Sequence, residues 1–157
     1  MFGGAGYIEE SGIAQFFRDV RVTTIYEGTN AIQALDLVGR KMADGGAAIY
    51  SLLCQIDETV KVAAGTAPGL CGPLGRACRR LSDASAGLLS RPVGARAVVA
   101  TDYAEAFALV LGGWYHLRSA MADPGRQPLA AFFMDRLLPF AGAHLQVVEN
   151  AAEPGQR

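Results

Sequence analysis

The chain has 157 residues, of which 51% are hydrophobic and 18% are charged, and its formal net charge is −1. This length fits one domain, or a small domain plus part of another, and the apolar fraction is too high for a disordered chain. Basic residues are scattered rather than gathered into a stripe, which argues against a nucleic-acid-binding protein.

The cysteines, Cys54, Cys71 and Cys78, form no CxxC pair and leave an odd count. This pattern favours a reducing, cytoplasmic location over a disulfide framework or a zinc site. His116 and His144 lack a second ligand at helical spacing, so no metal site is expected. No apolar run approaches the roughly 20 residues that a membrane span requires, and the N-terminus lacks the features of a signal peptide.

In chain order, the first predicted helix runs from Ser11, a good cap residue, through Val20. The stretch Thr23–Gly28 is rich in β-branched and aromatic residues and interrupts the helical pattern. A second helix is predicted to begin at Thr29 or Asn30. Apolar residues keep the 3–4 spacing of one helix face in both segments: Ile13, Phe16, Phe17 and Val20 in the first, and Ile32, Leu35, Val38 and Met42 in the second.

Gly45–Gly46 is expected to weaken or end the second helix, and a third apolar pattern continues to Val60. The glycine- and proline-rich stretch Gly65–Pro73 predicts a linker. Three further helical stretches follow: Leu74–Leu89, Gly94–Met121 and Leu129–Ala151. In the last of these, Pro139 should kink the helix or end its first half. No period-two alternation indicates a sheet, so the chain is predicted to be all-α, with a bundle of antiparallel helices after the linker.

The cluster Gly3-Gly4-Ala5-Gly6 departs from what a plain bundle needs. Because glycine costs about 0.5–1 kcal/mol in a helix relative to alanine, such a cluster marks a turn or a close backbone approach. A structural turn is the default interpretation. The functional alternative is that a phosphate or a flat cofactor lies close to this backbone.

The second unusual feature is Tyr26-Glu27-Gly28-Thr29-Asn30. It places a carboxylate just before a predicted helix N-terminus, where free N–H groups and the helix dipole favour negative charge. The adjacent glycine leaves room for a substrate. The plain alternative is an acidic residue that helps to cap the helix.

Read together, these segments resemble the C-terminal signature of acyl-CoA dehydrogenases, in order and in spacing. The resemblance rests on the glycine cluster with Tyr7, on Arg18-Asp19-Val20-Arg21, on the IYEGTN segment Ile25–Asn30, and on Ile32-Gln33. The remainder is similar, more loosely, to the extra helical domain of the larger family members. That similarity rests on Asp102–Ala120 and Ala130–Pro139.

The resemblance implies FAD-dependent α,β-dehydrogenation of acyl-CoA thioesters to trans-2-enoyl-CoA, as in fatty acid β-oxidation. Glu27 would remove the α-proton, and the β-hydrogen would leave as hydride to the flavin. The backbone N–H of Glu27 and a flavin hydroxyl would bind the thioester carbonyl and stabilise the developing enolate. Gly28 would lie against the substrate. The resemblance also implies that Phe2, Gly3 and Gly4 touch the FAD of a neighbouring subunit. Thr29 and Asn30 would lie near the FAD on the other side, so FAD would be shared with missing domains or with a neighbouring subunit.

Other residues have structural interpretations. Arg18 and Asp19 are expected in a buried or half-buried charge network, and Tyr26 beside the pocket. The later aromatic residues are predicted to lie in the core or at a subunit interface: Tyr103, Phe107, Trp114, Tyr115, Phe132 and Phe133. A small basic face is expected to be solvated, with contact to a CoA phosphate or a partner subunit as the alternative: Arg76, Arg79 and Arg80.

Two domains are predicted: residues 1–64, the end of the dehydrogenase C-terminal helical domain with the base loop, and residues 65–157, the additional helical domain. Family members carry an N-terminal helical domain and a middle β-domain before these parts, so we expect a fragment that is inactive or nearly so alone. The alternatives are a helical interaction module without catalysis and a complementing half of a split dehydrogenase. The implied partners are an acyl-CoA substrate, an electron-transfer flavoprotein or similar acceptor, and further subunits.

Overall fold

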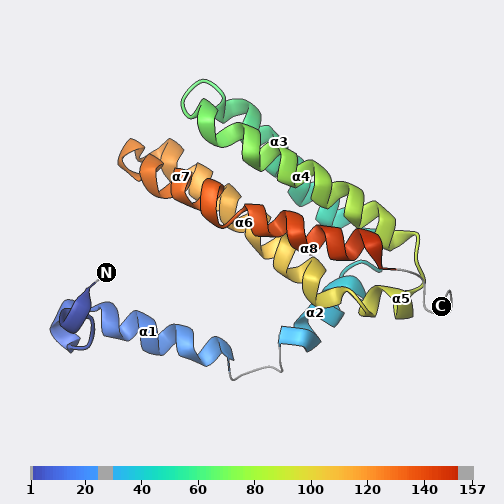
Figure 1. Cartoon of the computed structure of the whole chain (residues 1–157), viewed down its shortest axis with the longest axis horizontal. Coiled ribbons are helices and arrows are strands. Elements are labelled where there is room, and N and C mark those ends of the chain that lie inside the picture. The colour runs from blue at the N-terminus through green and yellow to red at the C-terminus, as the bar shows by residue number, and fades with distance from the viewer. Residues whose placement is uncertain (1, 25–29, 152–157) are drawn as a thin grey trace. The chain divides into compact units, whose positions relative to one another are not determined.

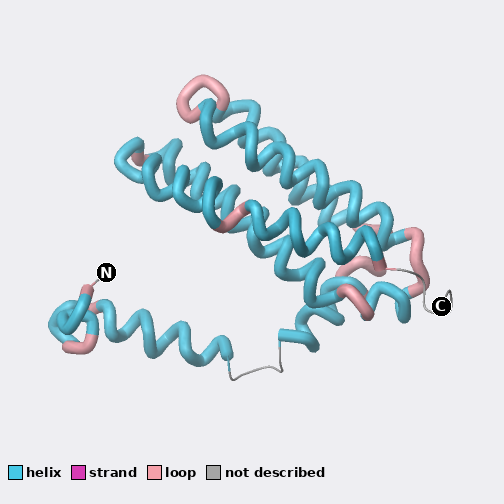
Figure 2. Tube along the Cα trace, viewed as in Figure 1, coloured by secondary structure: helices cyan, strands magenta, loops and turns pink. Residues whose placement is uncertain are grey.

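The computed structural model describes residues 2–24 and 30–151, and the chain divides into two compact units, Met1–Gln33 and Ala34–Arg157. All regular structure in the described residues is helical (Figures 1 and 2), which confirms the predicted all-α fold. The α-helices are α1 (Ile13–Arg21), α2 (Asn30–Val38), α3 (Ala47–Ala63), α4 (Pro68–Leu89), α5 (Val93–Ala97), α6 (Ala100–Ala122), α7 (Gln127–Arg136) and α8 (Pro139–Asn150). The short 3₁₀ helices are Gly3–Gly6, Glu9–Ser11, Val22–Thr24 and Pro124–Arg126.

Within the second unit, α3, α4, α6 and the α7–α8 pair alternate in direction along a bundle (Figure 1). The closest packing joins α6 to α8, α3 to α4, and α6 to α7. The core is built from apolar side chains at helical spacing, such as Leu74, Leu81 and Leu88 of α4, which are completely buried. Burying each such leucine stabilises the fold by about 1.5–3 kcal/mol, so the pairing of these faces holds the bundle together.

The predicted linker Gly65–Pro73 is wrong, because α4 begins at Pro68 and contains Pro73 within the helix. Pro68 stands in the first turn, where a missing N–H costs nothing. Pro73 lies in the second turn and removes one helical hydrogen bond. Leu70, Cys71 and Leu74 are nevertheless buried on one face, and this burial outweighs the loss. The domain boundary at 64/65 stays a prediction; α3 and α4 on its two sides pack against each other.

Two other helix boundaries differ from expectation. The helix predicted over Gly94–Met121 is divided into α5 and α6 at Val98–Val99, which turns α6 so that Val99 and Tyr103 are both buried. The second helix ends at Val38, before Gly39, rather than near Gly45–Gly46. Of its predicted face, Val38 and Met42 are buried, whereas Ile32 and Leu35 are exposed.

Glycine and proline punctuate the bundle where the chain reverses. Gly46 caps α3 with φ +81°, and a Cβ there would lie 2.8 Å from Cδ1 of Leu89, so only glycine fits. Pro139 begins α8 directly after α7 ends at Arg136. The predicted interruption at Pro139 is therefore confirmed. Two shorter helices, α7 and α8, take the place of one long helix in the bundle.

Candidate functional site

The glycine cluster forms a 3₁₀ turn, Gly3–Gly6, in the first unit. Phe2 caps it, Gly3 has φ +54°, and the Tyr7 N–H donates to the Gly4 carbonyl at 3.1 Å. A Cβ added to Gly3 or to Gly4 would meet no atom within 4 Å. The structure thus brings Phe2, Gly3 and Gly4 together on an open turn, and leaves their backbone accessible to a flat ligand.

The predicted catalytic base, Glu27, lies outside the described residues, together with Tyr26, Gly28 and Thr29. Their roles remain predictions. Asn30 is the first residue of α2, and its side chain is exposed. This confirms the predicted helix start just after the IYEGT segment, which places the segment in the sequence directly before a helix N-terminus.

The charged residues of α1 are more exposed than expected. Arg18 Nη2 lies 3.4 Å from Glu9 Oε1, and 57% of the Arg18 side chain and 81% of the Glu9 side chain are accessible to solvent. Asp19 is also exposed. The prediction of a buried or half-buried network is wrong for these residues, because the apolar side chains around them are exposed as well.

Helix α1 begins differently from the sequence prediction. Gly12, with φ +72°, is its N-cap, while the Ser11 hydroxyl donates back to the Ile8 carbonyl at 2.9 Å. The 3₁₀ turn Glu9–Ser11 directs Ser11 away from the helix, so its predicted capping role is wrong.

Large apolar side chains are exposed across the first unit. Phe16, Phe17 and Val20 share the predicted face of α1 and are 68%, 76% and 64% exposed, and Phe2 and Tyr7 of the glycine turn are 60% and 90% exposed. Contiguous exposed apolar surface marks a site of interaction with other protein or with a ligand. The first unit therefore carries a face suited to being covered by a partner.

The end of α2 is fastened by polar contacts that the sequence reading missed. Arg96 donates through Nε to the Arg91 carbonyl at 3.0 Å, through Nη2 to the Leu89 carbonyl at 3.1 Å, and through Nη1 to the Val38 carbonyl at 3.4 Å. Its guanidinium thus satisfies carbonyls left open where α4 and α2 end. The signal was weak, because an arginine in a short helix has many possible partners.

A carboxylate cap starts α3. Asp44 accepts the backbone N–H groups of Gly46, Ala47 and Ala48 at 2.8, 3.1 and 3.0 Å. These bonds, that of Ala48 first, hold the pKa of Asp44 below its usual range. An aspartate two residues before a glycine N-cap was a readable signal for this helix start.

The later aromatic residues divide between core and surface. Tyr103, Phe107 and Trp114 are buried, which confirms the core prediction for these three. Tyr115 and Phe132 are 57% and 56% exposed. The guanidinium of Arg118 covers the rings of Trp114 and Tyr115 at 5.1 and 5.7 Å from their centroids.

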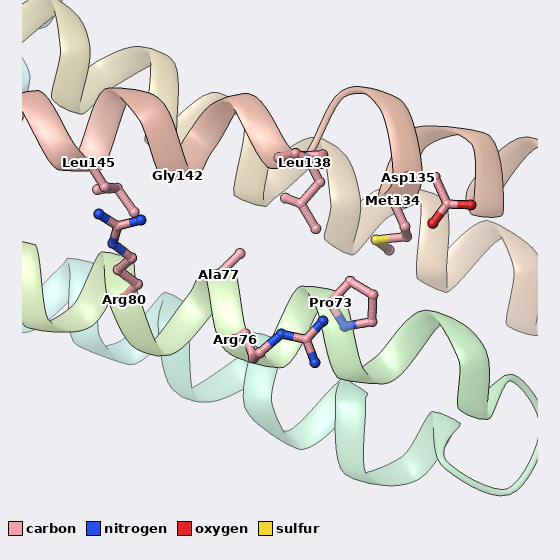
Figure 3. A pocket seen from close by; sticks show the side chains of 10 residues that line it. Pro73, Arg76, Ala77, Arg80, Met134, Asp135, Leu138, Gly142 and Leu145 are labelled. Carbon is pink, nitrogen blue, oxygen red and sulfur yellow. The ribbon is translucent and has the colours of Figure 1, made fainter.

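The predicted basic face borders a groove between α4 and the α7–α8 pair (Figure 3). Arg76 and Arg80 line it, whereas Arg79 does not. Arg80 forms a bidentate pair with Glu149, with both distances 2.8 Å, and also donates to Gln146. The sequence could place these arginines on one helix, but it could not show which helix lies opposite.

His144 Nδ1 lies 2.9 Å from Asp102 Oδ1, a pair that joins α8 to the first turn of α6. In the part of the chain that the structure describes, no cluster of three or more ligand-type residues could hold a metal ion. Among the same residues, no helix is both long and apolar enough to cross a bilayer.

Comparison with known families gives two matches. Residues 1–43 match the family model described as acyl-CoA dehydrogenase, C-terminal domain. Residues 52–154 match the model described as acetyl-CoA dehydrogenase C-terminal like. The two matches leave residues 44–51, around the start of α3, and residues 155–157 unmatched.

The named proteins to which the chain is similar include several acyl-CoA dehydrogenases. The chain is 37% identical over 133 residues to 3-methylmercaptopropionyl-CoA dehydrogenase of Ruegeria pomeroyi, a match that covers 83% of this chain and 17% of that protein. It is 42% identical over 64 residues to a broad-specificity linear acyl-CoA dehydrogenase of Mycobacterium tuberculosis, covering 40% of this chain and 10% of that protein. A short-chain specific acyl-CoA dehydrogenase of Megasphaera elsdenii is 51% identical over 35 residues, 22% of this chain and 9% of that protein. The chain thus spans less than a fifth of the length of these relatives.

Proposed function

The chain belongs to the acyl-CoA dehydrogenase family, and from this membership we propose that it supplies the base-bearing part of an active site that oxidises acyl-CoA thioesters. The observation that carries the proposal is the position of the first family match. Residues 1–43 contain every residue that the sequence assigned to the site. These residues are Phe2, Gly3, Gly4, Glu27, Gly28, Thr29 and Asn30.

In this proposal Glu27 takes the proton from the α-carbon of the thioester, and its backbone N–H donates to the thioester carbonyl as negative charge develops there. A positioned base contributes about 10²–10⁴-fold in rate, and a preorganised donor to the oxyanion adds to it. Gly28 leaves space for the substrate beside the carboxylate. The product is the trans-2-enoyl thioester.

FAD, when bound, accepts the β-hydrogen as hydride. The turn at Gly3 and Gly4 leaves room for such a flat group, because a Cβ at either position would have no atom within 4 Å. Phe2, exposed beside the turn, would add an apolar contact. We propose that Phe2, Gly3 and Gly4 contact the FAD of a neighbouring subunit, and that Thr29 and Asn30 lie near the FAD on the other side.

The flavin site is proposed to be shared with parts of the enzyme beyond these 157 residues, on the same polypeptide or on another subunit. The exposed apolar face of α1 supports this, since Phe16, Phe17 and Val20 offer surface for such parts to cover. An electron-transfer flavoprotein or similar acceptor is proposed to take the electrons. The free thiols of Cys54, Cys71 and Cys78 support a reducing, cytoplasmic setting.

Complementation tests the proposal. A family dehydrogenase that lacks the segment equivalent to this chain is mixed with the chain, and oxidation of an acyl-CoA is followed with an artificial electron acceptor. We expect activity to return with the wild-type chain and with Glu10→Gln, a matched loss of an exposed acid in the same unit. Glu27→Gln should abolish activity without weakening association.

The other outcomes separate the alternatives. Association with no activity, and with no effect of Glu27→Gln, would favour a non-catalytic helical interaction module. Purified alone, the chain is expected to show no flavin absorbance. A yellow protein that holds FAD by itself would contradict the shared site, and loss of activity in Glu10→Gln to the same degree as in Glu27→Gln would contradict the base assignment.

A further inference from the structure

The groove between α4 and the α7–α8 pair is lined by none of the residues assigned to the dehydrogenase reaction. It has a volume of about 400 Å³, within the range of about 300–1,000 Å³ that small-molecule sites occupy. All of its lining residues belong to the second unit, Ala34–Arg157. The groove is therefore formed entirely by described residues of the bundle, and Glu27 does not line it.

The groove exists because side chains are small where the helices face each other. Ala77 on α4 and Gly142 on α8 line it, and a Cβ on Gly142 would lie 3.3 Å from Nη1 of Arg80. The break between α7 and α8 turns Leu138 toward α4 (Figure 3). Apolar side chains that are 3%, 3% and 1% exposed complete the lining: Met134, Leu138 and Leu145.

Charge is distributed unequally along this lining. Arg80 is already paired with Glu149, so it has little to offer a ligand. Arg76 is exposed, and among the described residues it has no hydrogen bond or ion pair. Asp135, on α7, is likewise exposed and unpaired among those residues. The groove thus presents an apolar trough with one available guanidinium on the α4 side and one carboxylate on the α7 side.

We propose that the groove binds a medium-chain fatty acid, with the alkyl chain in the apolar trough and the carboxylate paired with Arg76. An arginine with no acidic partner beside an apolar surface matches an amphiphile with one negative charge. Asp135 on the opposite wall repels any anionic head group, and it repels a dianionic phosphate more strongly than a single carboxylate. A fatty acid bound here would contact residues of the second unit.

The experiment titrates the chain with dodecanoate below its micelle concentration, by calorimetry and by NMR of the methyl groups of Met134 and Leu138. Saturable binding with shifts at these methyls is expected. Arg76→Gln should weaken binding about fivefold, the scale of one exposed ion pair. The matched control Arg79→Gln, one turn along α4 and outside the groove, should leave the affinity unchanged.

A second variant tests the trough. Ala77→Leu fills it and is expected to weaken dodecanoate at least tenfold, with thermal unfolding used to check that the variant folds. Equal losses in Arg76→Gln and Arg79→Gln would reduce the effect to general surface charge and overturn the proposal. So would dodecylammonium binding as tightly as dodecanoate, unchanged binding in folded Ala77→Leu, or no shift at Met134 and Leu138.

Discussion

Gly112 on α6 lies against the ring of Phe133 on α7, so closely that a Cβ at Gly112 would stand 2.6 Å from Cζ of that ring. The same ring stacks on His116, one turn further along α6, with centroids 4.5 Å apart. The missing side chain at Gly112 is therefore what allows α7 to approach α6.

We expect Gly112→Ala to lower the free energy of unfolding by about 1 kcal/mol. Alanine gains about 0.5–1 kcal/mol over glycine in an open helix, but displacing a packed ring costs about 1–3 kcal/mol. Gly87→Ala in α4 is the control, because a Cβ there meets nothing within 4 Å, and it should stabilise the chain. Urea unfolding measures both. Stabilisation by both substitutions would contradict the close approach of α7.

The buried hydroxyls of Ser85 and Tyr103 form a hydrogen bond that joins α4 to α6. Ser85 Oγ donates to the Leu81 carbonyl at 2.7 Å, so its single proton is used and Tyr103 must donate to Ser85, also at 2.7 Å. Ser85→Ala leaves the Tyr103 hydroxyl without its acceptor, and we expect a loss of about 1–3 kcal/mol in urea unfolding. The double variant Ser85→Ala/Tyr103→Phe should lose less than the sum of the single variants. An additive result would indicate that the two hydroxyls do not interact.

Burial raises the pKa of Tyr103 to about 12. This group is neutral throughout the ordinary pH range. Its pairing with Ser85 is therefore a stability feature that pH does not switch.

The Arg80–Glu149 pair should make stability depend on pH. The Arg80 guanidinium holds the pKa of Glu149 below its usual range. A lowered folded-state pKa means that the contribution is present above the unfolded-state pKa and is lost as pH falls through the folded-state value. Glu149→Gln should thus cost stability at pH 7, by less than about 1 kcal/mol because both side chains are more than a third exposed.

The difference in the free energy of unfolding between Glu149→Gln and the wild type should become smaller below about pH 4, where carboxylates protonate. Unfolding by urea at a series of pH values measures it, with Glu105→Gln, an exposed acid on α6, as control. A difference that stays constant down to acid pH would argue against the ion pair.

The three thiols should differ in reactivity. Cys54 is exposed, whereas Cys71 and Cys78 are buried, and burial raises the pKa of both and brings that of Cys78 to about 11. The thiolate is the reactive form. Iodoacetamide at pH 8 should therefore modify one site rapidly in the folded chain and three in denaturant, as read by mass spectrometry. Cys54→Ser should remove the rapid reaction, and rapid modification of Cys78 would contradict its burial.

The existence of a helix followed from the sequence where apolar spacing was long and uninterrupted. In α3, for example, Ile49, Leu53 and Ile56 recur at helical spacing and are buried. Pro139 also acted as expected, since a proline begins a helix more readily than it continues one. The prediction of a linker over Gly65–Pro73 failed, because local preference alone favours a linker in a glycine- and proline-rich stretch. Burial of Leu70 and Leu74 against the rest of the bundle outweighed that preference.

For the candidate site, the order of motifs identified the family signature, and the cap residues predicted a helix start at Thr29 or Asn30. The sequence also gave a glycine turn, but not the exposure of the α1 face beside it. Periodicity shows that Phe16, Phe17 and Val20 share a side, and it carries no information about what covers that side.

By itself, the sequence determined an all-α chain and a family signature centred on Glu27, because helical periodicity and motif order are local properties of the chain. Only the tertiary structure decided that Gly112 receives Phe133, that Arg96 fastens the ends of α2 and α4, and that Arg76 borders an apolar groove. Each of these depends on which helix faces lie opposite one another. That choice is made by the packing of the whole bundle, where many weak contacts between distant residues act together.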